Sequence, residues 1–276
     1  MRLYYITVLL SSVLSVSAIA QDRQFAYTYQ SNTLSKGAMD LEAWNTVRFG
    51  REYFFQRLDT RLEMEVGLTN KLQSAVYINA SHSAFEMHLD TLGGIKDPNG
   101  WMITRESNFS ISNEWKWNAV SSATHKFGFA LYFEFGILSW ELEFENKLIF
   151  DRRTEKNLWA MNLVNDYEVR YEWKNKKAQR VHENEPEIDF AWMHLCKPNF
   201  GLGLEMVNSN EIEGSSWNFS ALFAGPAIYY AGDKNFLVFN FLPQLMNLHK
   251  TTDAPNDLVL NAREKYQFRL IWGFSL

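Results

Sequence analysis

The chain ends on the segment YQFRLIWGFSL, Tyr266–Leu276, in which every second residue is large and apolar or aromatic. Those residues are Tyr266, Phe268, Leu270, Trp272, Phe274 and Leu276. Successive side chains of a β-strand point to opposite faces, so this period predicts a strand with one apolar face. Chain termini usually fray, and a strand that reaches the last residue therefore needs a partner strand to hold it.

The same alternation recurs through most of the chain. In the segment 57–68, RLDTRLEMEVGL, apolar residues alternate with Arg57, Asp59, Arg61, Glu63 and Glu65. In the segment 159–173, WAMNLVNDYEVRYEW, the period persists over the whole length with one exception, Asn165. Counting backward from the terminal strand gives about 12 strands. Their expected ranges are 38–50, 54–68, 71–81, 106–118, 124–136, 139–151, 157–173, 187–196, 199–208, 216–230, 235–246 and 257–276.

A soluble β-sandwich also alternates, so strand length and composition must decide between it and a membrane barrel. Sandwich strands commonly span about 5 to 6 residues, whereas barrel strands that cross a bilayer need about 10. The long runs, and an aromatic share of 16%, favour the membrane. We therefore predict an all-β fold, a single transmembrane antiparallel up-and-down barrel over residues 38–276, with residues 21–37 as a periplasmic lead-in.

Residues 1–20, MRLYYITVLLSSVLSVSAIA, have the features of a secretory signal peptide. Arg2 precedes a short apolar run, and Ala18-Ile19-Ala20 provides small residues for cleavage. The run is too short to cross a bilayer as a helix. Cys196 is the only cysteine, so no intramolecular disulfide is possible. We expect export through a cleaved signal peptide to the outer membrane.

The lengths of the connections predict which side each one faces. With the C-terminus in the periplasm, five brief segments fall on the periplasmic side: LTNK, AVSSAT, RRTE, KPN and AGDKN. The longest connections, residues 82–105, 174–186, 209–215 and 247–256, fall outside. The mixed-charge run 174–187, KNKKAQRVHENEPE, is interpreted as a solvated external loop.

The polar faces of the predicted strands should line a charged lumen, because such charges are too costly to face lipid. The charged residues with lumen parity are Arg57, Asp59, Arg61, Glu63, Glu65, Glu141, Glu143, Glu145, Lys147, Asp166, Glu168, Arg170, Glu172, Arg263, Lys265 and Arg269. Across a wide pore, opposed charges would produce a transverse field and ion selectivity. In a narrow barrel they would pair and close it. Both hypotheses remain open at this point.

No catalytic motif accompanies this pattern. The six histidines are scattered, and the chain contains no Gly-x-Ser-x-Gly or His-Glu-x-x-His sequence and no Cys/His cluster. We predict no enzymatic activity, no cofactor, no metal and no nucleic-acid partner. The favoured function is a narrow porin-like channel or transporter for a small solute. A closed structural or surface-interaction barrel is the alternative, and an outer-membrane enzyme is the least favoured.

Several segments resemble Gram-negative outer-membrane β-barrels. The last strand is similar to the signal that the outer-membrane insertion machinery reads, although Leu276 stands where most such barrels end on Phe. The opening of the mature chain and its first turn are similar to those of a poorly characterised group of porin-like barrels and transporters. The matching residues are Thr33, Leu34, Lys36, Gly37, Asp40 and Glu42, with Gly67, Leu68, Thr69 and Asn70 at the turn. The resemblance implies contact with outer-membrane lipid and lipopolysaccharide, and with the insertion machinery during assembly.

Overall fold

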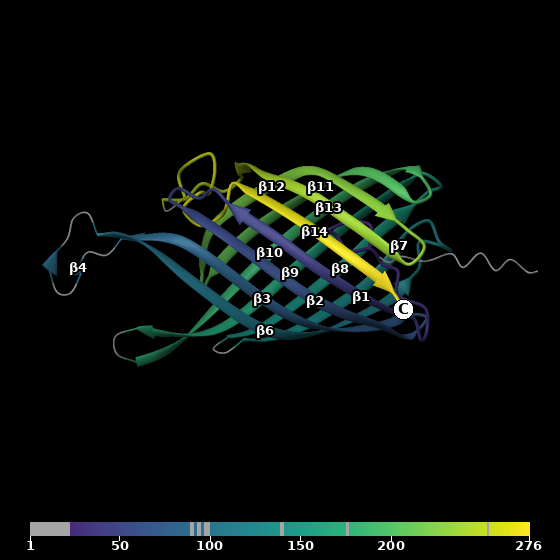
Figure 1. The fold of residues 1–276 in the computed structure, drawn as a ribbon, viewed down its shortest axis with the longest axis horizontal. Coiled ribbons are helices and arrows are strands. Elements are labelled where there is room, and N and C mark those ends of the chain that lie inside the picture. The colour runs from purple at the N-terminus through teal and green to yellow at the C-terminus, as the bar shows by residue number, and fades with distance from the viewer. Residues whose placement is uncertain are drawn as a thin grey trace, which may run out of the picture.

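The computed structural model describes residues 23–88, 91–92, 95–96, 100–138, 141–174, 177–252 and 254–276. Twelve strands close into one antiparallel barrel, and two very short strands form a separate hairpin beyond it (Figure 1). The predicted fold class and strand number are confirmed. The predicted signal peptide, residues 1–20, lies outside the described residues. None of the described residues forms a helix with the length and apolarity that a membrane crossing requires.

The barrel strands follow one another around the wall in chain order, apart from the hairpin inserted after β3. They are β1 (Met39–Phe49), β2 (Phe55–Thr69), β3 (Leu72–His88), β6 (Trp101–Val120), β7 (Gly128–Leu138), β8 (Glu141–Arg153), β9 (Asn157–Lys174), β10 (Lys177–Lys197), β11 (Phe200–Glu213), β12 (Ser216–Ala231), β13 (Asn235–Asn247) and β14 (Tyr266–Ser275). The inserted hairpin consists of β4 (Thr91–Leu92) and β5 (Ile95–Lys96).

The terminal strand closes the barrel. β14 pairs with β1 from Tyr266 opposite Phe49 to Ser275 opposite Asp40, and with β13 on its other side. The backbone N–H of Leu276 donates to the carbonyl of Met39 at 3.0 Å. Both edges of the last strand are therefore paired, which explains how a terminal strand avoids fraying.

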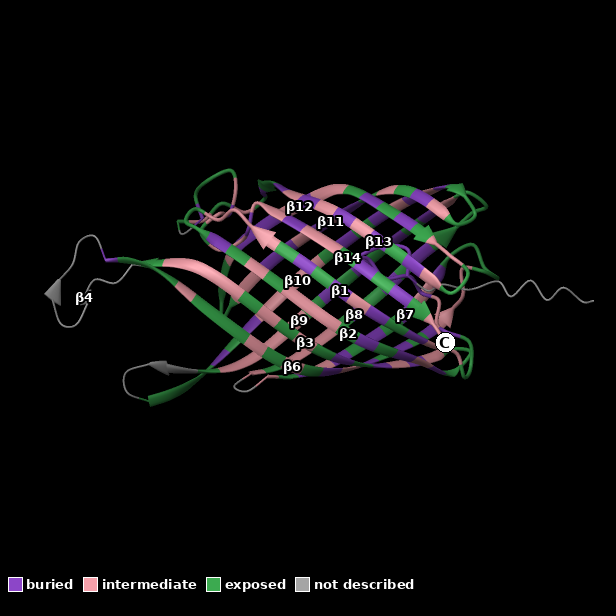
Figure 2. Ribbon diagram, viewed as in Figure 1, coloured by how far each residue is buried: buried purple, intermediate pink, exposed green. Residues whose placement is uncertain are grey.

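The outer face of the barrel is apolar. Buried and exposed residues alternate along the strands (Figure 2), and the exposed set includes Leu62, Ile78, Phe133, Leu148 and Leu204. A continuous exposed apolar surface of this kind is typical of a barrel in lipid and unusual on a soluble monomer. Aromatic side chains collect on this outer face near the end that holds the C-terminus, as in the interfacial girdle of a membrane barrel. They are Trp117, Trp159, Trp192, Tyr230 and Trp272.

The two ends of the barrel differ. The end that holds the C-terminus carries the five brief turns predicted from the sequence, and we call it the turn end. At the opposite end, the loop end, three of the four predicted long loops are wrong. Strands β3 and β6 extend through much of 82–105, β9 and β10 occupy 174–186 except the undescribed residues 175 and 176, and β11 reaches Glu213. The charged run 174–187 is thus mostly strand.

The fourth predicted loop is longer than expected. Residues 248–252 and 254–265 form no strand, so the last strand begins at Tyr266 and the prediction of a strand from 257 is wrong. Ala254 and Val259 are buried against Phe219, Phe223 and Leu242. The Gln244 side chain accepts the backbone N–H of Val259 at 2.5 Å. This segment therefore folds into the loop end of the lumen.

Candidate functional site

A segment of the chain lies inside the barrel. Residues Arg23–Ser31 precede β1, and all of them are buried except Tyr27, which is half-buried. We call this segment the plug. The sequence predicts residues 21–37 as a periplasmic lead-in outside the barrel, whereas the structure places Arg23–Ser31 in the lumen. Residues 24–30, QFAYTYQ, alternate as a strand does, but side chains of several barrel strands bind this backbone instead of a neighbouring strand.

Two polar side chains of the wall make most of the hydrogen bonds to the plug backbone, and Asn118 on β6 donates one more to the Ser31 carbonyl at 2.7 Å. Glu205 on β11 accepts the N–H groups of Ala26 at 3.1 Å, Tyr27 at 2.9 Å and Thr28 at 3.1 Å. Asn162 on β9 accepts the N–H of Tyr29 at 2.6 Å and donates to its carbonyl at 2.9 Å. A buried irregular segment must satisfy its backbone groups, and these two side chains do so in place of a β ladder.

Arginine side chains hold both halves of the plug. Arg23 is ion-paired with Glu42 at 3.1 Å, and its guanidinium lies 4.3 Å from the ring centre of Trp44. The guanidinium of Arg269 lies 3.6 Å from the ring centre of Tyr27 and donates to the Ala26 carbonyl at 3.1 Å. Cation–π contacts gain strength when water is excluded. The plug is thus attached to β1, β9, β11 and β14 around the wall.

The residues that carry the family resemblance guide the chain into the lumen. The N–H of Lys36 donates to the Asn70 side chain at 3.0 Å, and the N–H of Gly37 donates to the Gly67 carbonyl at 2.8 Å. Gly37 has a φ of 82°, which favours glycine. A Cβ at Gly67 would lie 2.1 Å from the Ser35 carbonyl oxygen. The motif around Lys36 and Gly37 and the turn at Gly67–Asn70 therefore contact each other where the chain leaves the lumen and enters β1.

Above the plug, the lumen contains a cavity of about 590 Å³ on the loop-end side, which we call the vestibule. Tyr27 and Tyr29 of the plug contribute to its lining. Eleven acidic and seven basic residues line it as well. This lining is strongly polar, because most of its side chains carry charged or hydrogen-bonding groups.

The charges of the vestibule are separated by sign. Nine carboxylates come from the consecutive strands β7 to β11, and we call them the acidic arc. They are Glu134, Glu141, Glu143, Glu145, Asp166, Glu168, Glu185, Glu187 and Glu211. Six arginines come from β14, β1, β2 and the segments beside them, and we call them the basic arc. They are Arg48, Arg51, Arg57, Arg61, Arg263 and Arg269. In the strand order, β3 and β6 separate the arcs on one side and β12 and β13 on the other, so the arcs face each other.

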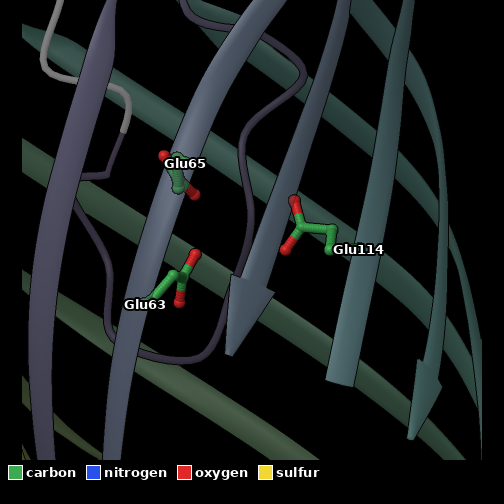
Figure 3. Close-up of side chains that lie close together, drawn as sticks. All are labelled: Glu63, Glu65 and Glu114. Carbon is green, nitrogen blue, oxygen red and sulfur yellow. The ribbon is translucent and has the colours of Figure 1, made fainter. Parts of the chain in front are cut away.

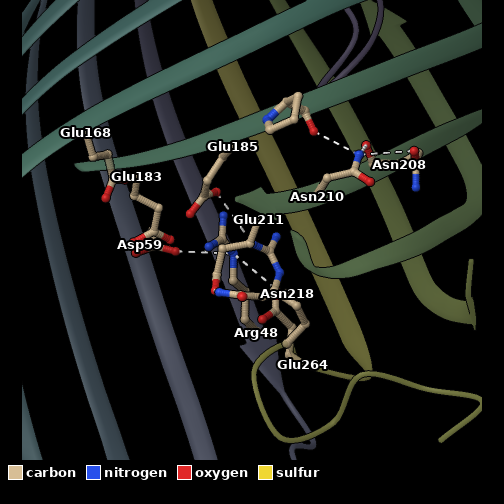
Figure 4. Close-up of polar contacts among 12 residues, drawn as sticks. Arg48, Asp59, Glu168, Glu183, Glu185, Asn208, Asn210, Glu211, Asn218 and Glu264 are labelled. Carbon is tan, nitrogen blue, oxygen red and sulfur yellow. Dashed lines mark hydrogen bonds and ion pairs between the residues drawn. The ribbon is translucent and has the colours of Figure 1, made fainter. Parts of the chain in front are cut away.

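Ion pairs connect the two arcs and neutralise some of their charges. Arg61 on β2 lies 3.6 Å from Glu134 on β7, a contact that crosses the lumen between the arcs. Arg48 contacts Asp59 at 3.5 Å and Glu264 at 3.6 Å (Figure 4). Burial favours the neutral form of Glu264, but Arg263 and Arg48 outweigh this effect and lower the pKa of its carboxyl. A smaller share of the acidic arc has an ion-pair partner. One residue that does is Glu145, which lies 3.0 Å from the Lys147 ammonium.

The structure brings most of the predicted lumen residues to this cavity. Those that line the vestibule are Arg57, Asp59, Arg61, Glu141, Glu143, Glu145, Lys147, Asp166, Glu168, Arg263 and Arg269. Glu63 and Glu65 lie elsewhere, near Arg23 of the plug. Arg170 is ion-paired with Glu183, and the Lys265 ammonium lies 5.3 Å from the ring centre of Tyr266. The side chain of Glu172 lies outside the described residues.

Several vestibule residues were not predicted from the sequence. Glu185 and Glu211 were assigned to loops, whereas β10 and β11 extend through both positions. Glu134 had the correct parity within the predicted strand 124–136 and could have been included. The terminal residues lie as the period predicts: Leu270, Trp272 and Phe274 are exposed on the outer face, Leu276 is exposed beyond the strand, and Tyr266 and Phe268 are half-buried beside them.

Solved structures with a similar fold are outer-membrane barrels. The NanC porin matches with a TM-score of 0.54 at 10% identity, covering 86% of this chain and 100% of its own. An outer membrane channel from Pseudomonas putida F1 matches with a TM-score of 0.54 at 9% identity, covering 89% and 98%. The beta domain of the Bordetella autotransporter BrkA matches with a TM-score of 0.51 at 8% identity, covering 88% and 100%. At these identities the similarity concerns the fold.

No curated protein sequence matches the chain. A family model does match it, over nearly the whole length and including both the plug and the barrel. The chain belongs to the family of unknown function DUF6662, whose model matches residues 17–276.

Proposed function

We propose that this protein is an outer-membrane channel for small charged solutes, and that the plug closes it. The observation that carries the proposal is the vestibule, where an acidic arc faces a basic arc across a lumen lined by charged side chains. A barrel whose only requirement was to be closed would be more stable with apolar side chains filling its lumen, because buried charges are costly even when they are paired. The separation of charge is instead suited to guiding a hydrated ion or a small polar molecule.

Several features support the location and the partners. The exposed apolar face and its aromatic girdle suit a bilayer, and the similar folds are those of outer-membrane porins and channels. The outer membrane, with its lipid and lipopolysaccharide, is therefore the proposed site. Export through a cleaved signal peptide and assembly by the insertion machinery through the terminal strand belong to the same proposal.

The plug favours one second candidate, a closed barrel without transport. It makes contacts with many strands and lies below the vestibule. The two functions separate in a planar bilayer when residues 23–31 are deleted. If the protein is a channel, the deletion variant should give unitary conductance. If the deletion variant retains its heat-modifiable gel migration yet gives no conductance, the closed barrel is correct.

The charged arcs predict the selectivity of that conductance. Acidic residues outnumber basic ones along the vestibule, so the reversal potential in a salt gradient should indicate a preference for cations. The triple variant Glu141→Gln, Glu143→Gln and Glu145→Gln should reduce the preference. A matched control, Glu52→Gln, Glu155→Gln and Glu213→Gln, removes the same charge from exposed positions that do not line the vestibule. Equal reversal potentials for the two triple variants would contradict the proposal.

A further inference from the structure

Three glutamates form a buried cluster on the lumen side of the wall, near the first described residue of the plug. Glu63 and Glu65 come from β2 and Glu114 from β6, and β3 lies between these strands. One carboxylate oxygen from each lies within 4.8 Å of the others. Figure 3 shows the three carboxylates turned toward a common space. At most 2% of each residue is exposed, so bulk solvent does not reach them.

Most of the oxygens in this cluster have no hydrogen-bond partner among the described residues. Both oxygens of Glu63 and both of Glu114 are unpartnered, as is one oxygen of Glu65. The other oxygen of Glu65 lies 3.8 Å from Arg23. Buried carboxylates left without donors are costly, and in folded proteins they are satisfied by a cation, a proton or water. Because one oxygen from each glutamate lies close to the other two, a single ligand can satisfy all three carboxylates.

The charges around the cluster leave a deficit of positive charge. Glu42 and Glu134 bring the carboxylates of the neighbourhood to five, and the cations that act on the group are Arg23, Arg61 and Lys116. Arg23 is shared with Glu42 at 3.1 Å. With all five carboxylates ionised, the three cations leave an excess of two negative charges, which one divalent cation would neutralise.

A second acidic cluster in the same barrel provides a contrast. Glu183, Glu185 and Glu211 also lie within 4.8 Å of one another, but each has a partner. Glu183 is paired with Arg170, Glu185 lies 3.8 Å from Arg263, and Glu211 accepts the Asn218 amide at 2.8 Å (Figure 4). Every carboxylate of this second cluster therefore has an arginine or amide partner, whereas both oxygens of Glu63 and of Glu114 in the first cluster have no hydrogen-bond partner among the described residues.

We propose that Glu63, Glu65 and Glu114 bind one divalent cation, and that calcium fits best. The donors are all carboxylate oxygens, which suit hard cations and not thiolate-seeking metals. Calcium accepts oxygen ligands at about 2.3 to 2.6 Å in flexible geometry, so oxygens up to 4.8 Å apart can share one ion. Magnesium needs about 2.0 to 2.1 Å and near-ideal octahedral geometry and usually keeps several waters, so it suits a site this buried less well than calcium does.

The test is calcium binding to the purified full chain in detergent after treatment with a chelator. Isothermal titration calorimetry should detect one calcium ion per chain, and calcium should raise the thermal unfolding midpoint. The double variant Glu63→Gln and Glu114→Gln should lose the binding. The matched double variant Glu183→Gln and Glu211→Gln removes the same charge from the partnered cluster and should bind calcium like the original chain.

Two outcomes would overturn the proposal. One is that the original chain binds no calcium at millimolar concentrations, in which case protons satisfy the carboxylates. The other is that the Glu63→Gln and Glu114→Gln variant binds calcium as the original chain does. If this double variant does not fold, Glu114→Asp replaces it, since that change keeps the charge but withdraws the oxygens. It should weaken calcium binding by about tenfold or more, and unchanged affinity would equally overturn the proposal.

Discussion

The carboxylate of Glu205 on β11 accepts the backbone N–H of Tyr27 at 2.9 Å, and this contact attaches the plug to the wall of the barrel. The same carboxylate binds the N–H groups on either side of Tyr27 and accepts the Asn240 amide at 2.6 Å. One buried acidic side chain thus organises three consecutive residues that have no secondary structure of their own. Hydrogen bonds to a charged group contribute about 1.5 to 3 kcal/mol each, so these three bonds are a large part of the attachment.

Replacing Glu205 should release the plug. In Glu205→Ala the three N–H groups lose their acceptor, and we expect chymotrypsin to cut after Tyr27 or Tyr29, which the original chain should resist. Glu211→Ala provides the control, because Glu211 lies on the same strand and lines the vestibule without a hydrogen bond to the plug. Equal protection of Tyr27 in all three proteins would show that Glu205 does not hold the segment.

The free-energy cost of placing a charge on the outer face should depend on the depth of that position in the membrane. Leu270 lies near the middle of β14 and is exposed on the outer face, whereas Leu276 lies at the turn end. Leu270→Arg should reduce the free energy of unfolding in liposomes by about 2 to 4 kcal/mol, and Leu276→Arg by about 0 to 1 kcal/mol. Reversible urea unfolding monitored by tryptophan fluorescence measures both values. Equal costs would mean that β14 does not cross the bilayer as proposed.

The lowered pKa of Glu264 predicts that its contribution to the free energy of unfolding depends on pH. Its pKa lies below the ordinary value in the folded state, so its contribution is present above the unfolded pKa and disappears as the pH falls through the folded one. Glu264→Gln should therefore destabilise the protein at neutral pH by leaving Arg48 and Arg263 less well paired. The difference from the original chain should shrink below about pH 4. A difference in unfolding free energy that stays constant between neutral and acid pH would contradict this ionisation.

The period of two predicted the barrel because lipid constrains only one face of each strand. Leu270, Trp272 and Phe274 face outward, and the alternation between apolar and charged residues is clear along β2, β8 and β9. Beyond the membrane both faces contact water, and the period disappears. The first residues of β10 are exposed on both faces, so the run 174–187 looked like a loop although its backbone pairs with β9.

The plug could not be predicted for a different reason. Its sequence alternates like a strand, and nothing local indicates that its partners are side chains such as Glu205 and Asn162, far along the chain. Parity predicted that Glu63 and Glu65 point inward, but their proximity to Glu114 depends on the register of β2, β3 and β6. The sequence suggested only a turn at Gly67. In the structure, the absence of a Cβ at Gly67 leaves room for the backbone of Ser35, which leads to the plug.

The most direct test of the central claim is the single-channel conductance of Glu205→Ala compared with the original chain and Glu211→Ala in planar bilayers. If the plug closes a conducting lumen, Glu205→Ala should open far more often, and the other two proteins should remain mostly closed. If chymotrypsin shows that the plug has left the lumen of Glu205→Ala, yet its conductance equals that of the original chain, the lumen is not a pathway and the proposed function is wrong.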